Sequence, residues 1–94
     1  MAATPGNDNY SAGLVLAELA DHWAIGEWIT DGALTVMPSA QPRYAALSTG
    51  EKNIVDIAWA MQQGRWDFPV VKVLELDSGW REIVMAAISA RVLA

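Results

Sequence analysis

His22 is the only histidine of the chain, and acidic residues accompany it at Glu18, four residues earlier, and at Asp21. A Glu and a His at this spacing lie on one face of a helix, where they could bind a metal ion or act as an acid–base pair. A metal site needs three or four ligands, however, and this pair supplies two, while Asp21 points elsewhere on the helix. We therefore expect His22 to be a helix-flank residue that hydrogen-bonds locally.

The other residue types that carry chemistry form no catalytic pattern. The chain has no cysteine, which excludes thiol nucleophiles, zinc–thiolate sites and disulfides and fits a reducing compartment. Its serines lie in no nucleophile-elbow motif, and its glycines form neither a Walker-type loop nor a Gly-x-Gly-x-x-Gly motif. The sequence predicts a protein that is not an enzyme and holds no cofactor or metal.

Tryptophan is the residue type that points to binding. The five tryptophans are many for 94 residues, and this side chain is enriched at binding hot spots, although most of the five are expected in the core. Trp66 and Phe68 fall instead in a short aromatic loop, residues 65–69, between a glycine and a proline. We predict a protein-binding surface made by Arg65, Trp66 and Phe68, with Trp28 as a further candidate.

Charge is unevenly distributed along the chain. The net charge is −5, and residues 1–42 hold five acidic residues with no Lys or Arg, whereas residues 43–94 hold six acids and six bases. An acidic surface repels phosphate backbones, because nucleic-acid affinity depends largely on Lys and Arg. Direct binding to DNA or RNA is therefore not expected.

The elements that position these residues are mainly helical. Residues 11–30 follow one apolar helical stripe, which predicts a long first helix that stops at Asp31-Gly32. The same pair could instead be the turn of a hairpin between residues 25–30 and 33–37. We favour the helix and keep the hairpin as the alternative, with a short strand around residues 33–37.

A capping box predicts where the next helix begins. The Ser48 hydroxyl can accept from the amide of Glu51, whose carboxylate can reach back to the amide of Ser48. This helix is expected to end at Gly64.

Two further elements follow the aromatic loop. Residues 70–76 could form a short helix capped by Asp67, but three of them are β-branched valines, so that a strand stays open. Asp77 and Ser78 then cap a final helix that runs to about Leu93, and its apolar residues lie almost all around the cylinder. We expect this helix to be buried on several sides.

The predicted fold is mainly α, a small bundle of three to four helices. Residues 11–94 form a single helical domain after a flexible arm over residues 1–10. The start of the chain lacks the pattern of a signal peptide, and no segment reaches the roughly 18 apolar residues of a membrane span. The expected location is the cytoplasm.

Three stretches resemble a pattern found in small uncharacterised proteins of actinobacteria and their phages. They are residues 47–51 (LSTGE), 57–59 (IAW) and 74–77 (LELD). The resemblance covers roughly residues 20–90 and brings no known catalytic residue. It implies an accessory protein, which would act in the host cytoplasm where a phage encodes it.

Composition indicates the class of function. Hydrophobic residues make up 53% of the chain, and a domain this small has little room to bury a surplus. We predict a non-enzymatic protein–protein interaction module that forms a homodimer or binds one protein partner. The alternative is a nucleic-acid-linked role, either as a degenerate helix-turn-helix unit or as an acidic mimic of DNA charge that occupies a DNA-binding protein.

Overall fold

Helices dominate the computed structural model, which describes residues 8–92. These residues form four α-helices, α1 (Asp8–Leu19), α2 (Thr49–Gln62), α3 (Val70–Leu74) and α4 (Ser78–Val92). Two short strands, β1 (Ile29–Thr30) and β2 (Ala33–Leu34), pair antiparallel, and three 3-10 turns lie between α1 and α2: η1 (Gly26–Trp28), η2 (Pro38–Ala40) and η3 (Tyr44–Ala46). The predicted small helical bundle with a short hairpin is confirmed.

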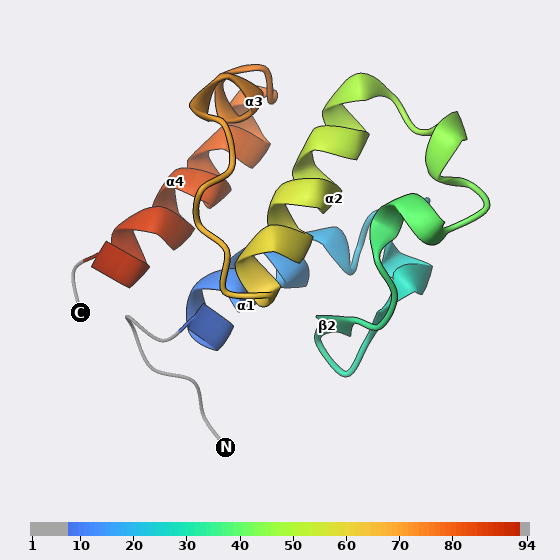
Figure 1. Cartoon of the computed structure of the whole chain (residues 1–94), viewed down its shortest axis with the longest axis horizontal. Coiled ribbons are helices and arrows are strands. Elements are labelled where there is room, and N and C mark those ends of the chain that lie inside the picture. Colours follow the sequence, from blue (N-terminus) through green and yellow to red (C-terminus); the bar gives the residue numbers. More distant parts are fainter. Residues whose placement is uncertain (1–7, 93–94) are drawn as a thin grey trace.

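The core is built around α1. This helix packs against both α4 and α2. In Figure 1 it passes behind the lower end of α2. Its buried side chains Val15, Leu16 and Leu19 belong to one apolar cluster with residues of α2 and α4, among them Ile57 and Val84. The position of α4 relative to α2 therefore depends largely on their shared contact with α1.

The start of α1 lies within the predicted N-terminal arm. Most of that arm falls outside the described residues, and its last three residues, from Asp8, already belong to α1. No helix within residues 8–92 is long and apolar enough to cross a membrane.

The long first helix expected over residues 11–30 is wrong, because α1 ends at Leu19. The chain then turns back on itself, and the N–H of Gly26 donates to the carbonyl of His22 at 2.9 Å. A Cβ on Gly26 would lie 2.5 Å from the carbonyl oxygen of Ala20. The tight turn that replaces the helix therefore requires glycine at this position.

The hairpin kept as the alternative is confirmed, with shorter strands than residues 25–30 and 33–37. Asp31 and Gly32 at its turn have φ values of 52° and 78°. Two successive positive φ values are typical of the type I′ turn that matches the twist of paired strands. The Asp31-Gly32 pair thus ends a strand and not a helix.

Gln62, at the end of α2, anchors the hairpin. Its Nε2 donates to the carbonyl of Leu34 at 2.7 Å, and its Oε1 accepts from the N–H of Leu34 at 2.8 Å. The side-chain amide makes the pair of hydrogen bonds that a neighbouring strand residue would make. The edge of β2 is thereby fixed to α2.

The predicted capping box at the start of α2 is confirmed. The Ser48 Oγ accepts from the N–H of Glu51 at 3.1 Å, and Glu51 Oε1 accepts from the N–H of Ser48 at 2.8 Å. The helix ends at Gln62, and Gly64 follows with a φ of 76°. The glycine therefore closes the helix as the sequence indicates.

Ser48→Ala is expected to lower the free energy of unfolding by about 1 kcal/mol, because the N–H of Glu51 loses its acceptor. For a domain of this size the melting temperature should fall by about 4–8 °C, measured by circular dichroism. Ser39→Ala, at an exposed serine in η2, is the matched control and should leave the melting temperature unchanged. Equal melting temperatures for the two variants would contradict a stabilising role of the box.

Residues 70–76, for which helix and strand were both open, contain the short helix α3. Its N-cap is Pro69 and not Asp67, and no side chain accepts a hydrogen bond there, so the predicted cap is wrong. Val73 and the following Leu76 are buried in the core. Burial of these two side chains on one side of the turn outweighs the β preference of the valines.

Asp77 caps α4 as predicted, since its Oδ1 accepts a backbone N–H at 2.9 Å. The expectation that α4 is buried on several sides is wrong. Val84 and Ala87 are buried along it, whereas Met85 and Val92 are exposed. Among the helices within residues 8–92, α1 and the short α3 make the main contacts with α4, and they leave part of its surface exposed.

Candidate functional site

A pocket of about 420 Å³ opens between the aromatic loop, α3 and the C-terminal half of α4. Such a volume is typical of binding pockets, which span about 300–1,000 Å³ and are mostly apolar. The lining is apolar apart from one arginine and consists of Trp66, Phe68, Val70, Val73, Leu74, Met85, Ile88, Arg91 and Val92. This lining can hold an apolar group by excluding water and offers no acid–base pair.

Arg81 fixes one wall of the pocket. Its Nη2 donates to the carbonyl of Leu76 at 3.0 Å and to that of Leu74 at 3.3 Å. These bonds satisfy carbonyl groups that a helix leaves without partners at its C-terminal end. The end of α3 is therefore held against the start of α4, while α4 runs on past it.

Trp66 and Phe68 form the other wall. Their ring centroids lie 6.1 Å apart with the planes tilted by 46°, and both rings are half-buried against the core. The guanidinium of Arg91 lies over the Trp66 ring, 5.0 Å from its centroid, which is a favourable cation–π geometry. The segment that carries both rings runs back between α2 and α4 in Figure 1.

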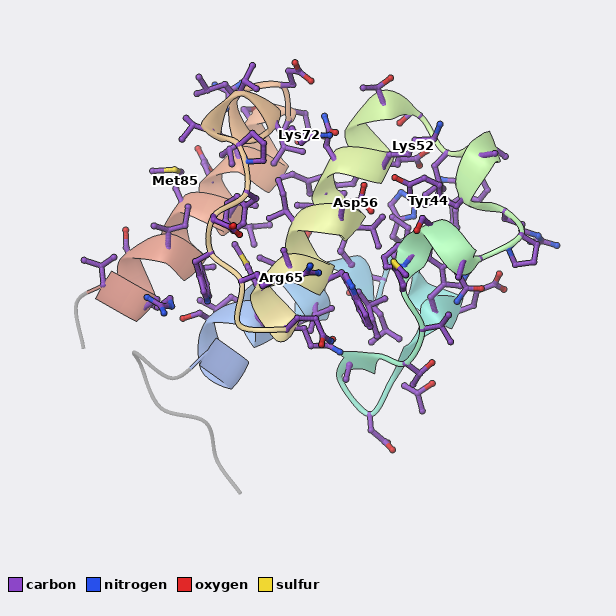
Figure 2. All side chains as sticks on the ribbon, in the orientation of Figure 1. Tyr44, Lys52, Asp56, Arg65, Lys72 and Met85 are labelled. Carbon is purple, nitrogen blue, oxygen red and sulfur yellow. The ribbon has the colours of Figure 1, made fainter. Side chains whose placement is uncertain are left out.

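The structure separates the four residues predicted to bind a protein. Trp66 and Phe68 both line the pocket. Arg65 is exposed near the end of α2 and is not part of the lining (Figure 2). Trp28 is only 6% exposed and lies in the core, so that its assignment as a contact residue is corrected.

The pocket residues of α3 and α4 were not predicted from the sequence. Of eight large apolar side chains exposed within residues 11–92, five lie on these two helices: Val70, Val71, Leu74, Met85 and Val92. Met85 stands on the outer side of α4 in Figure 2. The sequence does contain a sign of this exposed surface, because the final helix has more apolar residues around it than one buried face needs. Such a pattern is expected for a helix buried on several sides and equally for a helix whose extra apolar residues are exposed.

His22 is the centre of a second cluster. Its Nδ1 accepts from the backbone N–H groups of Ala24 and Ile25 at 3.0 and 3.2 Å, which confirms the predicted local hydrogen bonding. Its Nε2 lies 2.9 Å from Oε2 of Glu51, and Glu18 is not its partner. Since Nδ1 is an acceptor, the neutral ring carries its proton on Nε2, and this N–H donates a hydrogen bond to Glu51.

The cluster around His22 joins the ends of three helices. The ring centroids of Trp23 and Trp80 lie 5.8 and 5.7 Å from the centroid of the imidazole ring. The hydrogen bond from the Ser48 backbone, opposed by partial burial, holds the pKa of Glu51 below its usual range, and His22 lowers it further. Within residues 8–92 no group of three or more His, Asp or Glu side chains could hold a metal ion. The contacts of the cluster connect the end of α1 to the starts of α2 and α4.

Tyr44 and Asp56 form a further polar pair. The Tyr44 hydroxyl donates to Oδ2 of Asp56 at 2.6 Å, and the two side chains face each other in Figure 2. Burial, together with the hydrogen bond and charge of Asp56, raises the pKa of Tyr44 to about 12. The phenol therefore stays protonated at neutral pH and fastens η3 to α2.

Comparison with known proteins assigns the chain to no family. No protein-family model, no curated protein and no solved structure matches it. The resemblance to small proteins of actinobacteria and their phages stays a prediction.

Proposed function

We propose that the chain is a non-enzymatic protein–protein interaction module of the cytoplasm. Its contact surface is the α3–α4 face, defined as the five exposed side chains Val70, Val71, Leu74, Met85 and Val92 with the pocket beside them. The observation that supports this proposal is the gathering of these side chains around one pocket. Contiguous exposed apolar surface on a small protein marks an interaction site.

The chemistry of the face favours a protein partner over nucleic acid. In a degenerate helix-turn-helix unit, α3 would be the helix that reads bases. Its exposed side chains are Val70, Val71 and Leu74, with Lys72 as its one basic residue. Bases are read mainly by Arg, Lys, Asn and Gln side chains that hydrogen-bond to their edges, and aliphatic side chains contribute little.

The expected energy of contact is consistent with a specific interaction. Fully burying a large apolar side chain contributes about 1.5–3 kcal/mol, and the face offers several, including Leu74 and Met85. Association costs about 4–15 kcal/mol in lost translational and rotational freedom. Because the five side chains are 50–70% exposed, binding gains only that fraction of the full value, and the five together offset the lower part of the range. A partner side chain that enters the pocket contributes more.

Photo-crosslinking from two methionine positions tests the proposal. Met85 on the α3–α4 face and Met37 outside it are 50% and 51% exposed, so the pair is matched in type and accessibility. A photoreactive phenylalanine derivative at position 85 should crosslink a protein in cells of the source organism, and one at position 37 should not. The mass of the product distinguishes a second copy from another protein. Equal yields at the two positions, or no product at either, would overturn the proposal.

A further inference from the structure

The turn after α1 is held by a side chain that can change its charge. His22 accepts two backbone hydrogen bonds at Nδ1, from the N–H of Ala24 at 3.0 Å and from that of Ile25 at 3.2 Å. A neutral imidazole has one acceptor nitrogen, and a protonated imidazole has none, because both of its nitrogens carry a hydrogen. These two hydrogen bonds therefore exist only with the neutral ring.

The other contacts of the ring become stronger when it is protonated. Its Nε2 lies 2.9 Å from Oε2 of Glu51, where a charged imidazolium makes a charge-assisted hydrogen bond. Trp23 stacks on the ring with an interplanar angle of 23°, and the face of an indole attracts a cation. Protonation should therefore leave the ring in place and release the backbone around it.

Glu51 is the charged group of α2 that contacts the imidazole. The hydrogen bond from the Ser48 backbone, opposed by partial burial, holds the pKa of Glu51 below its usual range, so that this carboxylate stays ionised while a histidine titrates. The next residue of the helix, Lys52, has its ammonium over the Tyr44 ring. The group of this contact that takes up a proton on acidification is therefore the imidazole.

Around the rest of the ring, the charged residues are bonded elsewhere or exposed. The contact from α4 is the uncharged ring of Trp80, whose backbone N–H donates to Oδ1 of Asp77. Arg81, the next residue, donates to two carbonyls at the end of α3. Glu18 and Asp21, on the same segment as His22, are exposed. The electrostatic partner of the imidazole within residues 8–92 is therefore the carboxylate on α2.

We propose that His22 is a proton-operated switch: a proton from solvent binds Nδ1, releases the N–H groups of Ala24 and Ile25 and opens the turn, while the ring keeps its contact with α2. Histidine is the side chain whose charge ordinarily changes between about pH 5 and 8. The released segment carries Trp23, which at 86% is the most exposed large apolar side chain of residues 11–92. The switch therefore controls how this ring is presented, and it does not depend on the α3–α4 face.

Nuclear magnetic resonance from about pH 8 to 5 tests the switch on the unmodified protein. His22 is the only histidine, so the imidazole gives a single set of signals. At the alkaline end, the nitrogen shifts should show the proton on Nε2 and none on Nδ1. As the ring titrates, hydrogen-exchange protection of the Ala24 and Ile25 amides, relative to an unfolded chain, should fall with the same midpoint. The expected loss is at least about fivefold, the effect of one typical hydrogen bond.

Leu34 supplies a matched control within the same sample. Its N–H also donates to a side-chain acceptor, Oε1 of Gln62 at 2.8 Å, but a carboxamide does not titrate in this range. Protection of Leu34 should therefore stay constant. His22→Asn keeps an acceptor for the turn and removes the titration, so that protection of the amides at positions 24 and 25 should not follow the pH.

Any of four results would overturn the inference. An imidazole that stays neutral throughout the range would leave nothing to operate the turn, and one that titrates without a change at residues 24 and 25 would show that the turn does not need its acceptor. Equal losses at Leu34 would show unfolding of the domain and not a local opening. Losses that persist in His22→Asn would assign them to another group. The comparison of the amides within the wild type decides the question even where this variant does not fold.

Discussion

Trp28→Ala is expected to lower the free energy of unfolding by about 3–5 kcal/mol, the loss typical of removing a buried aromatic side chain. Trp28 is 6% exposed and belongs to the apolar cluster that joins the helices to the hairpin region. Small domains are stabilised by only about 5–15 kcal/mol in total. The variant should therefore be close to unfolding at room temperature.

Trp23→Ala provides the matched control for Trp28→Ala. The substitution is the same, but the side chain is 86% exposed, so the change in unfolding free energy should stay within about 0.5 kcal/mol. Urea denaturation followed by circular dichroism gives both values. Similar losses for the two variants would contradict the burial that the structure assigns to Trp28.

The two tryptophans show which part of a site the sequence can predict. The sequence favoured Trp28 as a contact residue and did not single out Trp23, because residue type does not show exposure, which depends on where α1 ends. The turn after α1 places Gly26 against the backbone of Ala20 and brings His22 to Glu51, 29 residues further on. No pattern within a few residues contains that information, so the sequence favoured a continuous helix.

Most features that depend only on neighbouring residues were predicted correctly, and the cap expected at Asp67 is the exception. The capping box of Ser48 and Glu51 and the Asp77 cap each involve atoms within three residues of one another. The Asp31-Gly32 turn is equally local, and the sequence offered it as an alternative to the helix. Where two local patterns competed, long-range contacts such as that of Gln62 with Leu34 decided the outcome.

In the candidate site, too, the part formed by neighbouring residues could be predicted and the part formed by distant residues could not. The aromatic loop with Trp66 and Phe68 is visible in the sequence as two aromatic residues between a glycine and a proline. The opposite wall, with Met85 and Arg91, lies about 20 residues further on and depends on how α4 packs against α1. Apolar composition alone does not say whether a side chain is covered, and in α4 it led to the opposite prediction.

His22→Ala is expected to have the next largest effect on stability, a loss of about 2–4 kcal/mol. The imidazole is 12% exposed, and its removal leaves the N–H groups of Ala24 and Ile25 without an acceptor. Each unsatisfied group costs about 1–3 kcal/mol, and these two lie in the lower part of that range because they are only partly buried. His22→Asn separates the contribution of these two hydrogen bonds from that of the contact with Glu51. An asparagine Oδ1 can accept from backbone N–H groups two or three residues further on, but the side chain is too short to reach Glu51. The Asn variant should therefore recover most of the stability in urea denaturation, and an Asn variant as unstable as the Ala variant would show that the contact with Glu51 holds the turn.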